Sequence, residues 1–159
     1  MRYLLIPLLL VVLAFGLLPY YQMYRLDRAL MLNDQETLAA LVDLDRVRGE
    51  QKRHLENSMD RLMGDTRTPF SQALRQGAAA FTSGQVDSVV TLEWIRDTLR
   101  PISTRSEDGY PSLSQYTTFA FFEGPTRFLQ RIRDLGERPL HLRWTLRDGR
   151  WRVTGIYLP

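Results

Sequence analysis

The feature that most constrains the fold is an uncharged, apolar run near the start of the chain, from Tyr3 to Tyr21. A helix over this run would be about 30 Å long, which is the thickness of the hydrocarbon core of a bilayer. A buried helix of a soluble domain would carry a polar stripe on one side, and this run carries none. We therefore expect residues 1–21 to be an uncleaved transmembrane anchor that contacts membrane lipid through residues 3–21, and residues 22–159 to form a single domain.

A cleaved signal peptide is the alternative explanation of this run. Residues 14–16 (AFG) resemble a cleavage site, although apolar residues follow them where a polar mature start is usual. The orientation of an anchor depends on its basic flanks, because positive charge favours the cytoplasmic side. Arg2 on one flank competes with Arg25 and Arg28 on the other, and we expect the N-terminus in the cytoplasm.

The composition is that of a globular protein. Hydrophobic residues make up 44% of the chain and charged residues 25%, as in ordinary globular proteins, so the composition does not suggest disorder. Cysteine is absent, so disulfides and cysteine-ligated metal sites are excluded. Lys52 is the only lysine, and arginine supplies the other cationic side chains apart from histidine. Arginine binds carboxylate, phosphate and aromatic groups better than lysine does, although a GC-rich genome also favours arginine codons.

Helical spacing and capping residues predict a helical half over residues 22–100. Tyr20, Met23, Leu26 and Leu30 recur at helical intervals, so the first helix is expected to continue beyond the apolar run. Caps and helix-breaking residues then predict four more helices. They cover residues 34–41, 45–63, 68–82 and 91–99.

The last part of the chain, residues 114–159, is predicted to form a four-stranded antiparallel sheet. Its strands are expected at residues 116–122, 127–133, 140–147 and 150–157. Asp148-Gly149 is a strong signal for a two-residue turn between the last two strands. With this turn Arg147 opposes Arg150, and the further pairs are Leu146–Trp151, Trp144–Val153 and Leu140–Tyr157.

This register puts apolar side chains on one face of the hairpin and basic ones on the other. The apolar face holds Leu140, Leu142, Trp144, Leu146, Trp151, Val153 and Tyr157. The polar face holds His141, Arg143, Arg147, Arg150 and Arg152, beside Thr145, Thr154 and Ile156. Helices followed by an antiparallel sheet with one apolar face predict an α+β fold in which the helices cover that face.

Several short motifs, spread over most of the chain, carry a resemblance to a known family. They are Pro19-Tyr20-Tyr21, Arg25, Ala29-Leu30, Asp34, Leu38, Leu41-Val42-Asp43, Arg48, residues 86–91 (VDSVVT), residues 149–153 (GRWRV) and Leu158-Pro159. These motifs resemble a bacterial family known only as domain of unknown function 2939. The resemblance implies a protein anchored in the bacterial inner membrane, and it brings no activity or catalytic residue. Together with the expected orientation, this predicts a single-pass protein whose domain lies in the periplasm. Leu44 departs from the family, which more often has an aromatic residue there.

The order of helices and sheet is also similar to the cone-shaped fold of nuclear-transport-factor-2-like and cystatin-like domains. Such domains enclose a ligand pocket or serve as adaptors, so the likeness by itself implies no function.

Asp43 is a weak candidate for a catalytic base, because isomerases of the cone-shaped fold use a pocket carboxylate. The alternative is structural: Asp43 caps a helix or forms an ion pair with Arg48. No second acid or base is evident nearby in the sequence, which favours the structural role. His54 and His141 lack a metal-binding spacing, so neither a metal site nor a cofactor is expected.

The basic face of the last hairpin is the most suggestive binding surface. It holds Arg143, Arg147, Arg150 and Arg152, with Arg127 and Arg131 as candidates to join them. Near a membrane, such a face fits anionic lipid head groups or an acidic envelope protein. The alternative is an outer sheet face that only contacts solvent. The net charge of +3 is too small to favour a nucleic-acid partner.

These features predict a non-enzymatic binding or assembly module anchored in the bacterial envelope. The alternatives are a pocket protein that binds a small hydrophobic ligand or lipid, and an enzyme that uses Asp43. One set of aromatic residues would either line such a pocket or form the core. The set is Tyr116, Phe119, Phe121, Phe128, Trp144 and Trp151. The sequence does not indicate the oligomeric state.

Overall fold

The computed structural model describes residues 2–63, 84–103, 112–133 and 139–158, without the side chains of residues 2–5, 8, 11, 59, 60, 62, 63, 102, 103 and 112. Its helices are α1 (Arg2–Leu32), α2 (Gln35–Leu41), α3 (Leu44–Met63), α5 (Leu92–Ser103) and α6 (Ser112–Gln115), and residues 84–89 are also helical. Its strands are β1 (Thr117–Gly124), β2 (Arg127–Ile132), β3 (Leu140–Arg147) and β4 (Arg150–Tyr157). The helix predicted over residues 68–82 lies outside the described residues.

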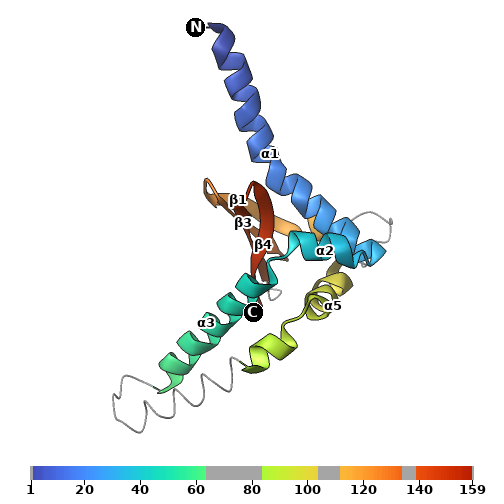
Figure 1. The fold of residues 1–159 in the computed structure, drawn as a ribbon, viewed down its shortest axis with the longest axis vertical. Helices are drawn as coiled ribbons and strands as arrows, with labels where there is room; N and C mark the ends of the chain where they lie inside the picture. The colour runs from blue at the N-terminus through green and yellow to red at the C-terminus, as the bar shows by residue number, and fades with distance from the viewer. Residues whose placement is uncertain (1, 64–83, 104–111, 134–138, 159) are drawn as a thin grey trace.

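The four strands form one antiparallel sheet in the order β1-β2-β3-β4 (Figure 1). The predicted α+β class with a four-stranded sheet is therefore confirmed. Trp144, Trp151 and Phe128 are the largest fully buried side chains, and all three belong to the sheet. Leu26 and Leu30 of α1 are buried in the same cluster, so the lower half of α1 covers the apolar face of the sheet.

The predicted transmembrane helix is wrong: in the part of the chain that the structure describes, no helix has both the length and the apolar character that crossing a bilayer requires. Two aromatic residues of the uncharged run pack on the sheet. The Phe15 ring lies 6.1 Å from Trp151, and the Tyr20 ring lies 5.1 Å from Phe128. The part of α1 before Phe15 is about 20 Å long, which is less than the thickness of a bilayer core.

The register of β3 and β4 follows the prediction near the turn and departs from it farther along. The pairs Arg147–Arg150, Leu146–Trp151 and Trp144–Val153 are confirmed. The predicted pair Leu140–Tyr157 is wrong because β4 contains a bulge between Val153 and Gly155.

The bulge exchanges the faces of the last two residues of β4. Beyond it, Ile156 opposes Leu142 and is fully buried, while Tyr157 opposes His141 on the outer face. The extra residue, Thr154, is buried, and its hydroxyl lies 2.7 Å from the hydroxyl of Thr145. The bulge therefore places a phenol, rather than an aliphatic side chain, among the arginines of the outer face.

The free edge of β4 is covered by the segment between α2 and α3. Val42 forms a parallel bridge with Val153, and the Asp43 N–H donates to the Val153 carbonyl at 2.9 Å. The Gln51 amide of α3 also donates to the Ile156 carbonyl. These contacts hold the start of α3 beside the outer face of the sheet.

Buried polar contacts connect α1, α6 and the sheet. Asp27 is fully buried in α1 and accepts the Leu113 N–H at 3.0 Å. Gln130, also buried, accepts the Trp144 indole N–H at 3.1 Å and donates to the Thr117 hydroxyl at 2.9 Å. Because each of these buried groups has a partner, the contacts fix how α6 and the sheet pack against α1.

Candidate functional site

Asp43 acts as the N-cap of α3. Its carboxylate accepts the Arg46 N–H at 3.3 Å and lies 3.8 Å from the Arg46 guanidinium. Arg48 instead contacts Asp45 at 3.8 Å and donates to the Val90 carbonyl at 2.9 Å. The predicted Asp43–Arg48 pair is therefore replaced, because residues five apart on a helix point about 140° away from each other, whereas residues three apart are neighbours.

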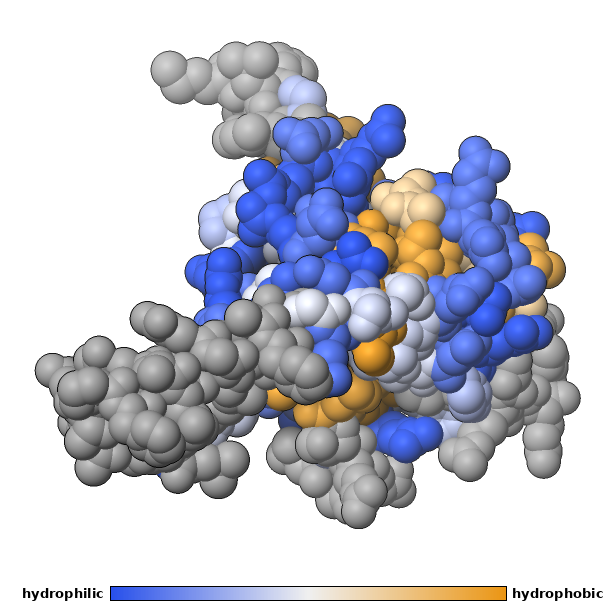
Figure 2. Space-filling model, turned by 60° about the horizontal axis from the view of Figure 1, so that its bottom comes forward, coloured by the Kyte–Doolittle hydropathy of each residue, from blue (hydrophilic) through white to orange (hydrophobic). Residues whose placement is uncertain are grey.

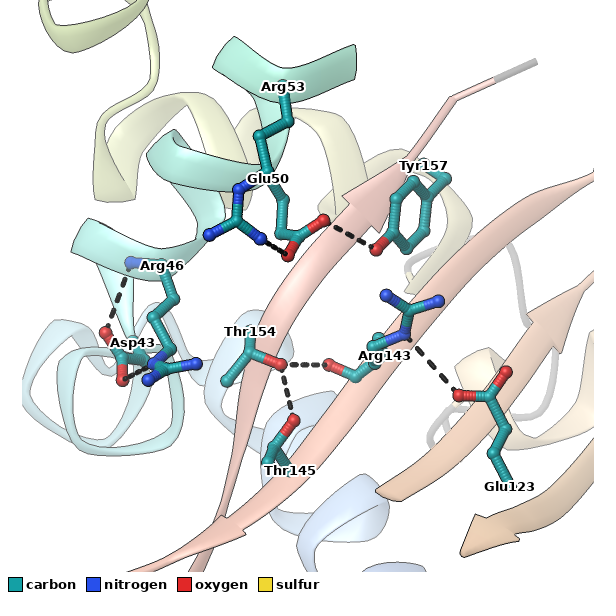
Figure 3. A network of polar contacts seen from close by, with 9 residues as sticks. All are labelled: Asp43, Arg46, Glu50, Arg53, Glu123, Arg143, Thr145, Thr154 and Tyr157. Atoms are coloured by element: carbon teal, nitrogen blue, oxygen red, sulfur yellow. Dashed lines mark hydrogen bonds and ion pairs between the residues drawn. The ribbon is translucent and has the colours of Figure 1, made fainter. Parts of the chain in front are cut away.

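The predicted basic face is divided into an inner, half-buried part and an outer, exposed part. Arg143 belongs to the inner part: its guanidinium lies 3.5 Å from Glu123 and stacks on the Tyr157 ring at 5.0 Å (Figure 3). The Tyr157 hydroxyl donates to Glu50 of α3 at 3.3 Å. Burial, together with the nearby carboxylates, raises the pKa of Tyr157 above its usual value of 10.0. Glu123 thus balances the charge of Arg143, while Glu50 forms its ion pair with Arg53 at 3.0 Å.

Arg152 also belongs to the inner part. It lies opposite Thr145 on the outer face and is half-buried. Beside it, the Thr154 hydroxyl lies 2.7 Å from the Thr145 hydroxyl and donates to the Arg143 carbonyl at 3.4 Å (Figure 3). Neither inner arginine is freely exposed, so a binding role for the whole face has to come mainly from its other members.

Arg147 and Arg150 are the exposed members of the predicted set. They face each other across the Asp148-Gly149 turn, where both residues have positive φ, as this type of two-residue turn requires. Arg127, at the start of β2, is also exposed. Arg131 lies farther down the same face, with its guanidinium 5.4 Å from the Phe119 ring centre and hydrogen-bonded to Thr118 at 3.2 Å.

The residues of the predicted aromatic set are divided between the core and the surface. Phe128, Trp144 and Trp151 are buried in the core. Tyr116, Phe119 and Phe121 are exposed, and the last two rings lie 4.8 Å apart. The set therefore does not line one pocket.

Two surface hollows lie outside the predicted site residues. One, of about 420 Å³, is mainly apolar and is lined by Gln51, Leu55, Gln85, Val86, Val89, Val90 and Trp94. Figure 2 shows apolar residues at the surface between hydrophilic areas at this end of the molecule. The other, of about 340 Å³, runs along α1 and α2 beside Tyr21, Tyr24, Arg25 and Arg28. Asp43 lines neither hollow.

Sequence reasoning missed the apolar hollow. The sequence shows that Val86, Val89 and Val90 are close together in the chain. Whether they share one surface depends on a helix at residues 84–89, which was not predicted. Only the packing of that helix against α3 turns the valines into one surface.

The first half of α1 extends beyond the sheet (Figure 1). From Ile6 to Ala14, every side chain that the structure describes is exposed, and none of them is polar. Five large ones, Ile6, Leu9, Leu10, Val12 and Leu13, are 54–62% exposed. By sequence every residue from Ile6 to Ala14 is apolar, so this segment of the helix has no polar side.

Comparison with known proteins gives one match. The model of a family described as a protein of unknown function (DUF2939) matches residues 8–98, more than half of the chain. This stretch includes most of α1, all of α2 and α3, and the lining of the apolar hollow. No curated protein and no solved structure matches the chain.

Proposed function

Because the chain belongs to the DUF2939 family, whose function is unknown, we propose a function from its own geometry: a non-enzymatic binding module that attaches to a lipid surface through the first half of α1. The observation that carries this proposal is the entirely apolar segment from Ile6 to Ala14, in which every described side chain is exposed.

A lipid bilayer fits this segment better than a protein partner does. A groove on another protein, or a second copy of α1, would cover one side of the helix and leave the opposite apolar side in water. Lipid chains surround a helix, and each buried apolar side chain then contributes about 1.5–3 kcal/mol. The described side chains from Ile6 to Ala14 would all be covered at once.

A binding role is favoured over an enzymatic one because side chains fill the space where a substrate cavity would lie. The space between α1 and the sheet is occupied by buried side chains such as Trp144, Trp151 and Phe128. Asp43, the candidate base, is held as a helix cap and paired with Arg46. A carboxylate in this setting stabilises the start of α3 rather than facing a substrate cavity.

A second candidate is a carrier of a small hydrophobic ligand, favoured by the apolar hollow beside Val86, Val89 and Trp94. The predicted likeness to cone-shaped domains belongs to this candidate, although the hollow lies among helices rather than between helices and sheet. If a fluorescent fatty acid binds the chain equally well after Val89→Asp, this hollow is not its site.

Flotation with phosphatidylcholine vesicles tests the proposed lipid attachment. The full-length chain, mixed with vesicles in detergent that is then removed, should float with the lipid. Leu10→Asp should lower the partition constant for the vesicles about a hundredfold, because a charge at hydrocarbon depth costs about 2.5–3.5 kcal/mol. The matched control is Leu32→Asp, at the other end of α1, where leucine is 66% exposed.

The control variant should float as the unmodified chain does. The proposal fails if the unmodified chain stays at the bottom of the gradient, or if both variants lose flotation to the same extent.

A further inference from the structure

The end of the sheet beside the exposed half of α1 is formed by two hairpin turns. Trp151, the second residue of β4, contacts Phe15 of α1, which marks where the helix leaves the domain. The Phe122 ring, near the end of β1, lies 5.8 Å from Trp151. The β1–β2 and β3–β4 turns therefore lie at the same end of the sheet, toward which the first half of α1 projects (Figure 1).

Three exposed arginines mark these turns: Arg127 follows the first, and Arg147 and Arg150 flank the second. We call them the hairpin-tip arginines. Among the described residues, none of the three forms an ion pair, in contrast to Arg143 with its partner Glu123. Asp148 is the one acidic residue of the β3–β4 turn, so the tips carry an excess of positive charge.

Arg147 and Arg150 are held side by side by the backbone. They form the pair that closes the two-residue turn, so their side chains leave the same face of neighbouring strands. Like charges placed directly opposite each other destabilise a strand pair. An anion between the two guanidinium groups would remove this repulsion, and a phosphate group matches the donor geometry of arginine.

We propose that the hairpin-tip arginines bind the phosphate groups of anionic phospholipids, so that the protein prefers anionic over neutral lipid surfaces. This inference rests on the proposed attachment through α1. When the exposed half of α1 lies in lipid, the turns beside Phe15 come to the level of the head groups. The same position argues against an acidic protein as the partner, because the lipid surface would occupy the space in front of the turns.

The test compares two double variants by flotation of the full-length chain. Arg147→Gln/Arg150→Gln removes two charges at the tips, and Arg53→Gln/Arg61→Gln removes two exposed charges from α3. Each is measured with phosphatidylcholine vesicles and with vesicles that also contain phosphatidylglycerol. At about fivefold per charge near an anionic surface, the tip variant should bind the anionic vesicles roughly 30-fold more weakly than the unmodified chain.

With neutral vesicles the tip variant should bind as the unmodified chain does, and the α3 variant should keep the preference for anionic vesicles. The preference of the unmodified chain should also weaken as salt is added, because salt screens exposed charges. The inference is overturned if the tip variant keeps the full preference or if the α3 variant loses it equally. If the unmodified chain binds neither kind of vesicle, the attachment through α1 fails as well; binding to both without preference overturns the arginine assignment alone.

Discussion

At the scale of single residues, the outer face of the sheet changes the pKa of His141. It is half-buried on β3, opposite Arg131 of β2 and Tyr157 of β4. Burial, and then the nearby Arg131 charge, lower the pKa of His141 below its usual value of 6.5. Both causes disfavour the imidazolium form in the folded protein.

A histidine whose pKa is lowered by folding stabilises the protein above its unfolded pKa and loses that contribution as the pH falls through the folded pKa. We therefore expect the stability of the protein to decrease below about pH 6.5, and to decrease less in the variant His141→Gln. Urea unfolding at a series of pH values measures this difference. In Arg131→Gln, an NMR titration should find the pKa of His141 closer to 6.5, though still below it, because burial is the larger cause. A pKa for His141 at or above 6.5 in the unmodified protein would contradict this explanation.

Individual polar residues were the hardest to assign from the sequence. Asp27 and Gln130 are both buried, although residues of these types are mostly exposed. Nothing local distinguishes them from solvent-exposed residues, because their partners, the Leu113 N–H and the Trp144 indole, are far away in the chain. The N-cap at Asp34 was predictable, because its partner Thr37 is only three residues away.

At the scale of elements, the bulge in β4 decides which side chains face the arginines. The prediction assumed that apolar and polar residues alternate strictly along both strands, and it gave the correct pairs from the turn as far as Val153. The alternation of residues does not indicate that β4 contains an extra residue. The only local sign of a bulge was Gly155, because glycine inside a strand often marks one. This explains why the prediction assigned Ile156 and Tyr157 to the wrong faces.

Gly155 also makes room for the Tyr157 ring, and Gly155→Ala should remove that room. A β-carbon at this position would lie 2.9 Å from the Tyr157 hydroxyl and 3.1 Å from two ring carbons. The ring has to move away from Arg143 and Glu50, and we expect a loss of about 1–3 kcal/mol in the free energy of unfolding. Urea unfolding measures this loss. Gly49→Ala, where the space around the added carbon is open, is the control.

A double-mutant cycle shows whether Tyr157 is the cause. In a Tyr157→Ala background, Gly155→Ala should cost much less than it does alone. An equal cost in both backgrounds would mean that the strain lies in the backbone of the bulge instead.

At the scale of the whole molecule, the uncharged run at the start of the chain has two parts with different surroundings. The described side chains from Ile6 to Ala14 are exposed, whereas the rings of Phe15 and Tyr20 pack on the sheet. The sequence predicted the helix and its continuation toward Leu30, but not this division. The division depends on contacts with Trp151 and Phe128, more than a hundred residues later.

The two ends of the molecule should therefore respond differently to lipid. The chain has no cysteine, so single cysteines introduced at Leu10, at Thr126 of the β1–β2 turn or at Val89 can carry an environment-sensitive fluorophore. With vesicles that contain phosphatidylglycerol, we expect a blue shift of the emission from the first two positions. Val89, 57% exposed beside the apolar hollow at the opposite end, should show none. A blue shift at position 89 equal to that at position 10 would contradict the proposed orientation.

The bridge between Val42 and Val153 covers the β4 edge of the sheet and so determines at which edge another strand can be added. With β4 covered by this segment, β1 is the remaining outer strand among the described residues, and its backbone can still pair with an added strand. A strand from another chain would then extend the sheet only on the β1 side, next to the exposed rings of Phe119 and Phe121. Among the described residues, assembly through strand addition would be one-sided: two chains would pair β1 to β1 and close as a dimer, because β4, the other outer strand, is covered at Val153 and Ile156.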